Sequence, residues 1–521
     1  TPPAPSPADP DEAYTVPIRP AATEESDAIA QGLNGVGRVD SYSVGTFADP
    51  PGTTGDRGSD TQVALHSGVA PDAPLVGLQG LSGPIPFLGE YATEFSETFN
   101  LRAVNMSWGY VGGLPLGAAG GASGDVFGDV VGGIRDMAEQ GILTVAAAGN
   151  AATPANGNGA PAVADETISV VATGPKDGIS GYSSGGIGAV DDGEDGTYMK
   201  PDVTAPGGTL DDLVTAAEAD TDYSEFDTDT GPQDYTGKAG TSMAAPFTSG
   251  VAGLVADAME DEDPEGNNKS ILNSTAQSGI NDTFRLKQVI LATATETVFT
   301  AAPYHRAKSP SCQGGGRDPF EGYGRVNPDA AVDAVTRNVY GGGDSLTNDE
   351  FSPDDADEPV TSSYGVTDSD GNELTVGLDV PQDNRAVAGY VEAPRGVLDL
   401  TVSAGNLRGA DVSMATGAPQ VDVFVYDGEN PGPNGVPNVV AQGTIDATSG
   451  VGARRGSLTL TVDTGEEFDL GRRDEVDTRT LFVVAKLVNI PGLVNGFDAR
   501  TDIEFRASFT PEFEPLPEID V

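Results

Sequence analysis

The chain of 521 residues carries 80 acidic residues against 27 basic ones, and its formal net charge is −53. Because nucleic-acid binding needs a basic face, this charge excludes DNA and RNA as expected partners. The length and the 37% hydrophobic content indicate a globular chain of more than one domain, and the 70 Gly and 38 Pro indicate many loops.

The acidic residues are spread over both halves of the chain, and lysine is scarce. Such a surface repels itself at ordinary ionic strength and destabilises the compact state. At about 1 M salt the Debye length falls to about 3 Å, so the repulsion is screened. We therefore interpret the chain as a protein of an extreme halophile, most simply an archaeon. An ordinary acidic secreted protein is the alternative.

Three features of the sequence bear on where the protein is located. The single cysteine, Cys312, excludes an intramolecular disulfide framework. No apolar stretch reaches about 18 residues, so the sequence predicts no transmembrane helix. The chain begins with Thr1 rather than Met, which we interpret as the processed N-terminus of an exported protein, although a boundary chosen for expression would look the same. We expect an extracellular or cell-surface location.

Changes in composition divide the chain into four parts. Residues 1–27 are rich in proline and acidic residues and are expected to be extended. Residues 28–338 alternate short apolar runs with helical periodicity, and residues 339–358 have the composition of a linker. Residues 359–521 change to a period of two, which is typical of strands. The sequence thus predicts an α/β domain followed by an all-β domain.

Strands and helices alternate in the first domain. Residues 102–109 (RAVNMSWG) and 142–150 (ILTVAAAGN) have the pattern of buried parallel strands. Helical spacing is present in GDVFGDVVGGIRDMAEQG, SMAAPFTSGVAGLVADAM, LKQVILATAT and NPDAAVDAV. Gly141 is expected to end the first of these helices, and Asn327 to cap the last. This order predicts a doubly wound parallel sheet with helices on both faces.

The second domain reads as a series of short strands. Apolar and polar residues alternate in LDLTVSA, VDVFVYD, SLTLTVD, TLFVVAKLV and DIEFRASF, which predicts a β-sandwich or jelly roll. Residues 367–374 (TDSDGNEL) resemble half of a calcium loop, with a polar hairpin turn as the alternative. The acidic segments 191–196 and 220–229 are either further sites for Ca²⁺ or Na⁺ or solvated loops. No cofactor is required by any motif.

Six segments together resemble the subtilisin-like serine proteases. GTSMAAP (240–246) resembles the motif of the nucleophilic serine, NMSWG (105–109) the substrate-binding strand, and VAAAGN (145–150) the strand ending in the oxyanion-hole asparagine. GVAPDAPL, KPDVTAPG and GYGRVNPDAAV resemble further blocks of the same domain, in the same order. By composition, the halolysins of salt-loving archaea are the most similar subgroup. The resemblance implies the subtilisin fold.

The resemblance also implies site residues. It places Ser242 at the nucleophile and Asn150 at the oxyanion donor. A helix N-terminus favours negative charge developing beside Ser242, and one oxyanion donor contributes about 3–4 kcal/mol in a subtilisin. Ser107, Trp108 and Gly109 are placed along the substrate cleft. Trp108 would narrow the first specificity pocket, with simple core packing as the alternative.

The catalytic histidine of the family has no counterpart. The family pattern HGTHVA aligns with GSDTQVA, which puts Ser59 at the catalytic histidine and Gln62 at the second histidine. Phe247 stands where many members have another histidine. Neither a hydroxyl nor a carboxamide is a general base near neutral pH. The two histidines of the chain, His66 and His305, remain as alternative bases.

Alternatives also exist for the position of the family aspartate and for a carboxylate that would replace the histidine as the base. Asp40 fits the local pattern of the family aspartate, whereas a different register puts Val44 there and leaves no aspartate. The sedolisins, which are acid-active relatives, use a glutamate in place of the histidine, and Asp60 lies one residue from that position. Asn150 argues against this alternative, because sedolisins have an aspartate in the oxyanion hole.

The size of the loss in kcat that follows from a missing histidine favours an inactive protein. In a subtilisin, loss of the histidine costs about 10⁶ in kcat, and the oxyanion hole with binding leaves about 10³–10⁴ over water. The sequence therefore predicts an exported pseudoprotease that serves as a structural or peptide-binding component at the cell surface. Its expected partner is a protein, a peptide or another copy of the chain. The alternative is an active secreted endopeptidase that uses Ser242 with an unrecognised base.

Overall fold

The structure is a computed structural model of residues 1–521. It describes residues 68–70, 73–77, 92, 94, 96, 100–109, 127–152, 158–174, 178–185, 190–191, 197–198, 200–217, 235–260, 279–295, 297, 320–336, 360–364, 386–394, 396–408, 420–446, 454–464, 478–488 and 500–511. The chain divides into two compact units. One takes in Thr1–Gly77 and Leu213–Lys238, and the other takes in Leu78–Asp212 and Ala239–Val521.

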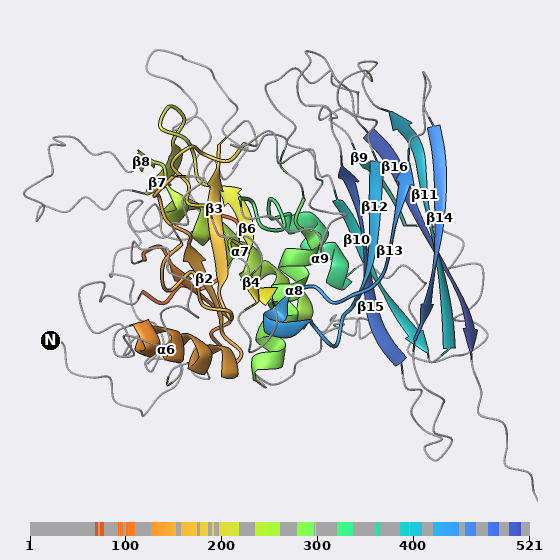
Figure 1. The fold of residues 1–521 in the computed structure, drawn as a ribbon, viewed down its shortest axis with the longest axis horizontal. Coiled ribbons are helices and arrows are strands. Elements are labelled where there is room, and N and C mark those ends of the chain that lie inside the picture. The colour runs from red at the N-terminus through yellow and green to blue at the C-terminus, as the bar shows by residue number, and fades with distance from the viewer. Residues whose placement is uncertain are drawn as a thin grey trace, which may run out of the picture. The chain divides into compact units, whose positions relative to one another are not determined.

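The larger unit contains a four-stranded sheet with the order β1-β2-β3-β6. Its strands are β1 (Ala103–Met106), β2 (Leu143–Ala147), β3 (Ile168–Thr173) and β6 (Val203–Pro206). All three neighbouring pairs are parallel. Strands β2 and β3 are buried along their whole length, as in a sheet with both faces covered. The predicted parallel sheet is confirmed (Figure 1).

Helices pack with this sheet as the periodicity predicts. They include α6 (Phe127–Glu139), α7 (Thr241–Glu260), α8 (Ile280–Thr293) and α9 (Pro328–Thr336). Helix α7 contacts all four strands of the sheet. Gly141, with φ 82°, follows the end of α6, and the side-chain oxygen of Asn327 accepts the N–H of Ala330 at 3.1 Å. Both predicted helix-end residues are therefore confirmed.

Two short antiparallel pairs were not predicted. Strands β4 (Val190–Asp191) and β5 (Thr197–Tyr198) form one, and β7 (Val214–Ala217) and β8 (Tyr235–Lys238) form the other. The segments 1–27, 339–358, 367–374 and 220–229, together with Cys312, lie outside the described residues. Within the described ranges, no helix has the length and apolar character needed to cross a membrane.

The C-terminal β region, defined as strands β9 to β16, forms two antiparallel four-stranded sheets. The inner sheet has the order β10-β15-β12-β13, with β10 (Ala386–Pro394), β15 (Thr478–Val488), β12 (Gln420–Asp427) and β13 (Val439–Asp446). The outer sheet has the order β14-β11-β16-β9, with β14 (Arg454–Asp463), β11 (Gly396–Arg408), β16 (Arg500–Pro511) and β9 (Val360–Tyr364). The expectation of an all-β C-terminal region is confirmed, although β9, β10 and β13 were not foreseen.

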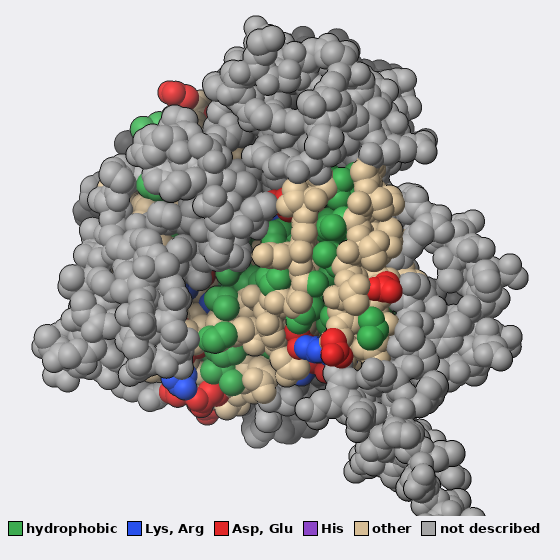
Figure 2. All heavy atoms as spheres, turned by 45° about the vertical axis from the view of Figure 1, so that its right-hand side comes forward, with side chains coloured by type: hydrophobic (Ala, Val, Ile, Leu, Met, Phe, Trp, Pro, Cys, Tyr) green, Lys and Arg blue, Asp and Glu red, His purple; other side chains and the backbone are tan. Residues whose placement is uncertain are grey.

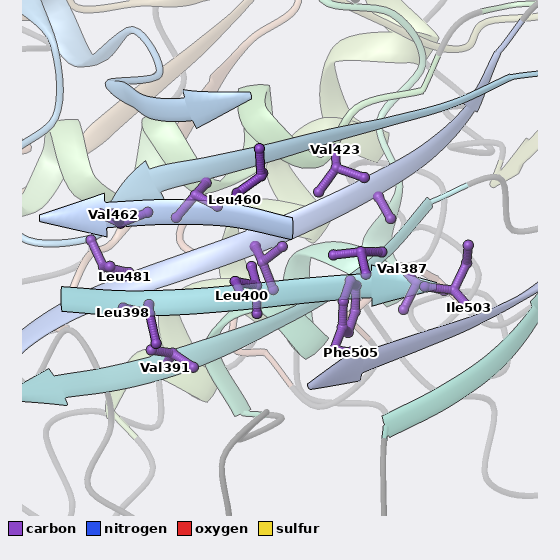
Figure 3. Packing of buried hydrophobic residues seen from close by; sticks show 14 of the residues in the cluster. Val387, Val391, Leu398, Leu400, Val423, Leu460, Val462, Leu481, Ile503 and Phe505 are labelled. Carbon is purple, nitrogen blue, oxygen red and sulfur yellow. The ribbon is translucent and has the colours of Figure 1, made fainter. Parts of the chain in front are cut away.

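Both sheets contribute to one hydrophobic core. Side chains such as Val423 and Leu481 from the inner sheet meet Leu400 and Phe505 from the outer sheet (Figure 3). Alternate residues of a strand point to opposite faces, so each strand gives every second side chain to this core. Each sheet therefore has a second face that points away from this core. The surroundings of that second face differ between the inner and the outer sheet.

Candidate active site

The candidate site begins where helix α7 begins. Thr241 is the first residue of the helix, so Ser242 lies in its first turn, where the helix dipole is positive. Gly240 precedes it, and a Cβ built on Gly240 would lie 3.4 Å from Asn150 Nδ2 and 3.6 Å from the backbone N of Ser242. The glycine thus keeps the space between the serine and the asparagine open.

Ser242 and Ser107 form a reciprocal pair of hydrogen bonds. Ser242 Oγ donates to the backbone oxygen of Ser107 at 3.0 Å, and Ser107 Oγ donates to the backbone oxygen of Ser242 at 2.8 Å. The pair joins the start of α7 to the residue that follows β1. The Ser242 hydroxyl therefore directs its proton at a backbone carbonyl, which is not a general base.

Asn105 and Ser249 extend the hydrogen bonds of this pair. Asn105 Nδ2 donates to Ser107 Oγ at 3.0 Å. Ser249, about two turns along α7 from Ser242, donates to Asn105 Oδ1 at 3.4 Å and to the backbone oxygen of Ala245 at 3.0 Å. Sequence reasoning did not single out Asn105. The available signal was its position two residues before Ser107, which puts both on the same side of the strand.

Thr241 fixes the orientation of the Asn150 side chain. Asn150 Oδ1 accepts hydrogen bonds from the backbone N of Thr241 at 3.1 Å and from Thr241 Oγ1 at 3.0 Å. Thr241 Oγ1 in turn accepts the N–H of Gly149 at 3.1 Å. With its oxygen held there, the amide presents its NH₂ group toward Gly240, beside Ser242. This orientation suits donation to an oxyanion. Thr241 is thus a positioning residue that motif reading overlooked.

A close backbone approach holds the neighbouring loop. The N–H of Gly240 donates to the oxygen of Gly207 at 2.9 Å, and a Cβ on Gly207 would lie 2.5 Å from the Ala172 Cβ. The Tyr182 hydroxyl lies 2.9 Å from the same Gly207 oxygen and 2.7 Å from the Gly208 oxygen. Burial raises the pKa of Tyr182, and hydrogen bonds with Ser180 and Gly240 oppose that rise. The phenol therefore stays a neutral donor that pins this loop.

Trp108 and Gly109 extend from the same strand. Trp108 is half-buried and packs against the cluster that includes Met106 and Ile134, so part of its ring serves as core packing. Gly109 is exposed, and a Cβ there would lie 3.4 Å from the Ala160 oxygen. These two residues continue the chain beyond Ser107, after the end of β1, which is an edge strand of the described parallel sheet.

The structure brings Ser242, Ser107 and Asn150 together at one site. The positions proposed for the other catalytic groups, Asp40 and Ser59, lie outside the described residues, as do Gln62, Asp60 and both histidines. Phe247 lies in α7 and is half-buried. Among the residues that the structure describes, no group of His, Cys, Asp and Glu is arranged to hold a metal ion.

Comparisons with known proteins find matches to parts of this chain. Several solved structures align with it at low sequence identity. They include the prenylagaramide maturation protease PagA (18% identity, 52% of this chain and 78% of that chain, TM-score 0.33) and sphericase (17%, 47% and 62%, TM-score 0.30). Another is a protease from Pseudoalteromonas arctica (20%, 51% and 64%, TM-score 0.32). Residues 51–324 match the model of the subtilase family, and since this match spans more than half of the sequence, the chain belongs to the subtilase family.

Proposed function

We propose that this subtilase holds a peptide or protein segment in its cleft without cutting it. The observation that carries the proposal is the state of the nucleophile position. Ser242 Oγ donates its proton to the carbonyl of Ser107, and the family's histidine aligns with Ser59. No histidine stands among the residues that the structure describes to take this proton, and about 10⁶ in kcat is lost in a subtilisin that lacks its histidine.

The binding part of the proposal rests on the strand end. Ser107, Trp108 and Gly109 follow β1, an edge strand of the described sheet, and an extended peptide can add to such an edge. An incoming peptide N–H would replace the Ser242 hydroxyl as the donor to the Ser107 oxygen. The exchange conserves the number of hydrogen bonds at that oxygen, so the cleft is suited to reversible occupation.

The setting that we propose is outside the cell of a salt-loving archaeon. The formal charge of −53 supports this setting, because screening by concentrated salt is needed to relieve such repulsion. On the face shown in Figure 2, the described acidic side chains stand in small separate groups rather than in one patch. Ca²⁺ or Na⁺ in the acidic segments is compatible with the proposal, which requires neither ion.

An active endopeptidase is the second candidate. The orientation of the Asn150 amide favours it, since a donor held by Thr241 beside Ser242 is placed to stabilise the oxyanion of a tetrahedral intermediate. Membership of the subtilase family supports a peptidase-type function in the same way. This candidate requires a base from outside the described residues.

A fluorophosphonate probe at high salt separates the two candidates. The wild-type chain is expected to remain unlabelled and to leave casein intact, with Ser242→Ala as the matched control. Ser59→His is expected to gain labelling at Ser242, because it supplies a base at the aligned position. Stoichiometric labelling of the wild-type chain, lost in Ser242→Ala and accompanied by casein cleavage, would instead establish an endopeptidase.

A further inference from the structure

The inner sheet of the C-terminal β region buries both of its faces. On β12, Val423 points into the core shared with the outer sheet, whereas Phe424 and Tyr426 point to the opposite face and are 3% exposed each. The ring of Tyr426 stacks 5.9 Å from Phe424 and 4.9 Å from Phe482 of β15. Aromatic side chains of this kind need a cover other than water.

Helices of the predicted α/β domain, residues 28–338, which is called the subtilase domain here, provide that cover. Helix α9 packs against β10 and β15, and α8 packs against β10 and α9 (Figure 1). Burial raises the pKa of Tyr426 well above its ordinary value, with contributions from Tyr323 of the subtilase domain and from Asp422. Helix α9 also packs against α7, the helix that begins at Ser242. The second face of the inner sheet is therefore part of the core of the subtilase domain.

Gln288 of α8 joins the ends of two strands. Its Nε2 donates to the backbone oxygen of Asp427 at 2.8 Å, and its Oε1 accepts the N–H of Asn438 at 2.8 Å. The N–H of Asp427 itself donates to the oxygen of Asn438 at 3.0 Å. Gln288 is fully buried, so its carboxamide adds one more rung to the ladder between β12 and β13. Loss of this side chain leaves the buried oxygen of Asp427 and the part-buried N–H of Asn438 without these partners, which is costly.

The loop between those strands, residues 428–438, is called the clasp loop here. Asp427 Oδ1 accepts the N–H groups of Glu429 and Asn430, both at 3.0 Å, and Asp427 Oδ2 pairs with Arg479 at 2.5 Å. Arg285 of α8 donates through Nε to the oxygen of Glu429 at 2.9 Å. The clasp loop is thus held in shape by its own strands and bound by α8.

Lys287 connects the clasp loop to the parallel sheet. A Cβ built on Gly435, whose φ is 74°, would lie 3.1 Å from the Cδ of Lys287, so the loop lies directly on the lysine stem. The Lys287 ammonium donates to the backbone oxygens of Asp165 at 2.5 Å and Thr167 at 3.1 Å, next to β3. One side chain therefore packs against the β region and binds the subtilase domain.

From these contacts we infer that the C-terminal β region is an obligate folding partner of the subtilase domain. The two unfold as one cooperative unit, because separation would expose the aromatic face and break the Gln288, Arg285 and Lys287 contacts together. The β region is then no tethered accessory that binds an outside partner through its inner sheet. This inference does not depend on whether Ser242 is reactive.

The single tryptophan makes the inference testable in the full chain. Trp108 lies in the subtilase domain, so its fluorescence reports that domain alone, while far-UV circular dichroism reports both regions. Leu400→Ala changes a residue of the outer sheet in the core of the β region. We expect it to lower the thermal midpoint by about 3 °C in both signals, in heating runs at high salt.

Two further variants serve as a second test of the inference and as a control. Gln288→Ala is milder and is expected to shift both signals together. Thr459→Ala, on the exposed face of the outer sheet, is the matched control and is expected to shift neither. A Trp108 midpoint that stays at the wild-type value in Leu400→Ala, while the dichroism midpoint falls, would overturn the inference. So would native Trp108 fluorescence in a Leu400→Ala chain whose β region is unfolded at room temperature.

Discussion

Both sheets of the C-terminal β region are four-stranded and antiparallel. They differ in the second face, the one that points away from the shared core. The inner sheet turns aromatic side chains away from the shared core, and they are buried. The outer sheet turns hydroxyl groups outward, with Thr401 and Thr459 joined at 2.9 Å between their Oγ1 atoms and Thr461 donating to Asp399 at 2.5 Å. The side chains on the second face, rather than those in the shared core, therefore distinguish a sheet that is exposed to solvent from a sheet that packs against another domain.

The largest expected effect tests the covered face directly. Phe482→Ala removes a ring that is 2% exposed and stacked on Tyr426, so the resulting cavity is expected to cost about 3–5 kcal/mol. Thr459→Ala on the solvent face is expected to stay within about 0.5 kcal/mol. Urea unfolding at high salt measures both. Equal small losses would mean that the aromatic face carries no packing energy.

The next effect concerns the close approach of β13 and β14, where the two sheets meet. A Cβ built on Gly456 would lie 2.3 Å from the Cγ2 of buried Ile445. Gly456→Ala is therefore expected to cost about 1–3 kcal/mol through overpacking. Ser457→Ala, on the adjacent exposed residue, is the control and is expected to be nearly neutral. A neutral Gly456→Ala would show that the two sheets can separate there without loss.

The third effect follows from a charge on the covered face. Burial lowers the pKa of Lys486 to about 7, and Asp422 opposes that shift. Between about pH 7 and the ordinary lysine value near 10.5, the unfolded chain binds the extra proton, so stability at this residue rises with pH. Lys486→Met removes this pH dependence, so its stability relative to the wild type is expected to be on the order of 1 kcal/mol greater below pH 7 than near pH 10. A constant cost for leaving buried Asp422 without its cation adds to this difference at every pH.

The stability of Lys486→Met relative to the wild type is therefore expected to fall as the pH approaches 10. Thermal midpoints at fixed salt from pH 6 to 10 measure it, and Lys238→Met, at an exposed lysine, serves as the control. A constant difference in thermal midpoint between Lys486→Met and the wild type across this range would contradict the lowered pKa of Lys486.

The smallest effects compare one cross-strand pair from each sheet. Tyr426 and Phe482 are register partners on the inner sheet, and aromatic coupling there is expected to be about 0.5–1.5 kcal/mol. Thr401 and Thr459 are register partners on the outer sheet, with an expected coupling of about 0.2–0.5 kcal/mol. Double-mutant cycles measure both. A larger coupling for the threonine pair would reverse the ranking of the two faces.

Part of this contrast can be read from the strands themselves. SLTLTVD alternates strictly, which predicts one solvated face, and β14 has one. TLFVVAKLV is apolar on both sides, which is typical of a strand covered on both faces, and β15 is buried from Thr480 to Lys486. The sequence could not say what covers it. The cover comes from α8 and α9, far away along the chain, and the pairing of Gln288 with two strand ends depends on the finished fold.

The candidate site was predictable to a similar extent. Motifs located Ser242, Asn150 and Ser107, which the structure brings together. They did not reveal the hydrogen bonds of Thr241 and Asn105, because those depend on how two loops approach the start of α7. Asp40 and Ser59 remain sequence-based predictions, since they lie outside the described residues.

The buried ammonium of Lys287 has a consequence for the chemical reactivity of the chain. Lys200 and Lys486 are buried as well, at 2% and 5% exposure, whereas Lys238 is exposed. Lysine is scarce in this sequence, and three of the four lysines that the structure describes are buried. At these three positions, reagents that acylate amines will therefore report opening of the fold, whereas Lys238 will react at the surface. A time course of acylation at Lys287 would follow the separation of the clasp loop from helix α8 in the native protein.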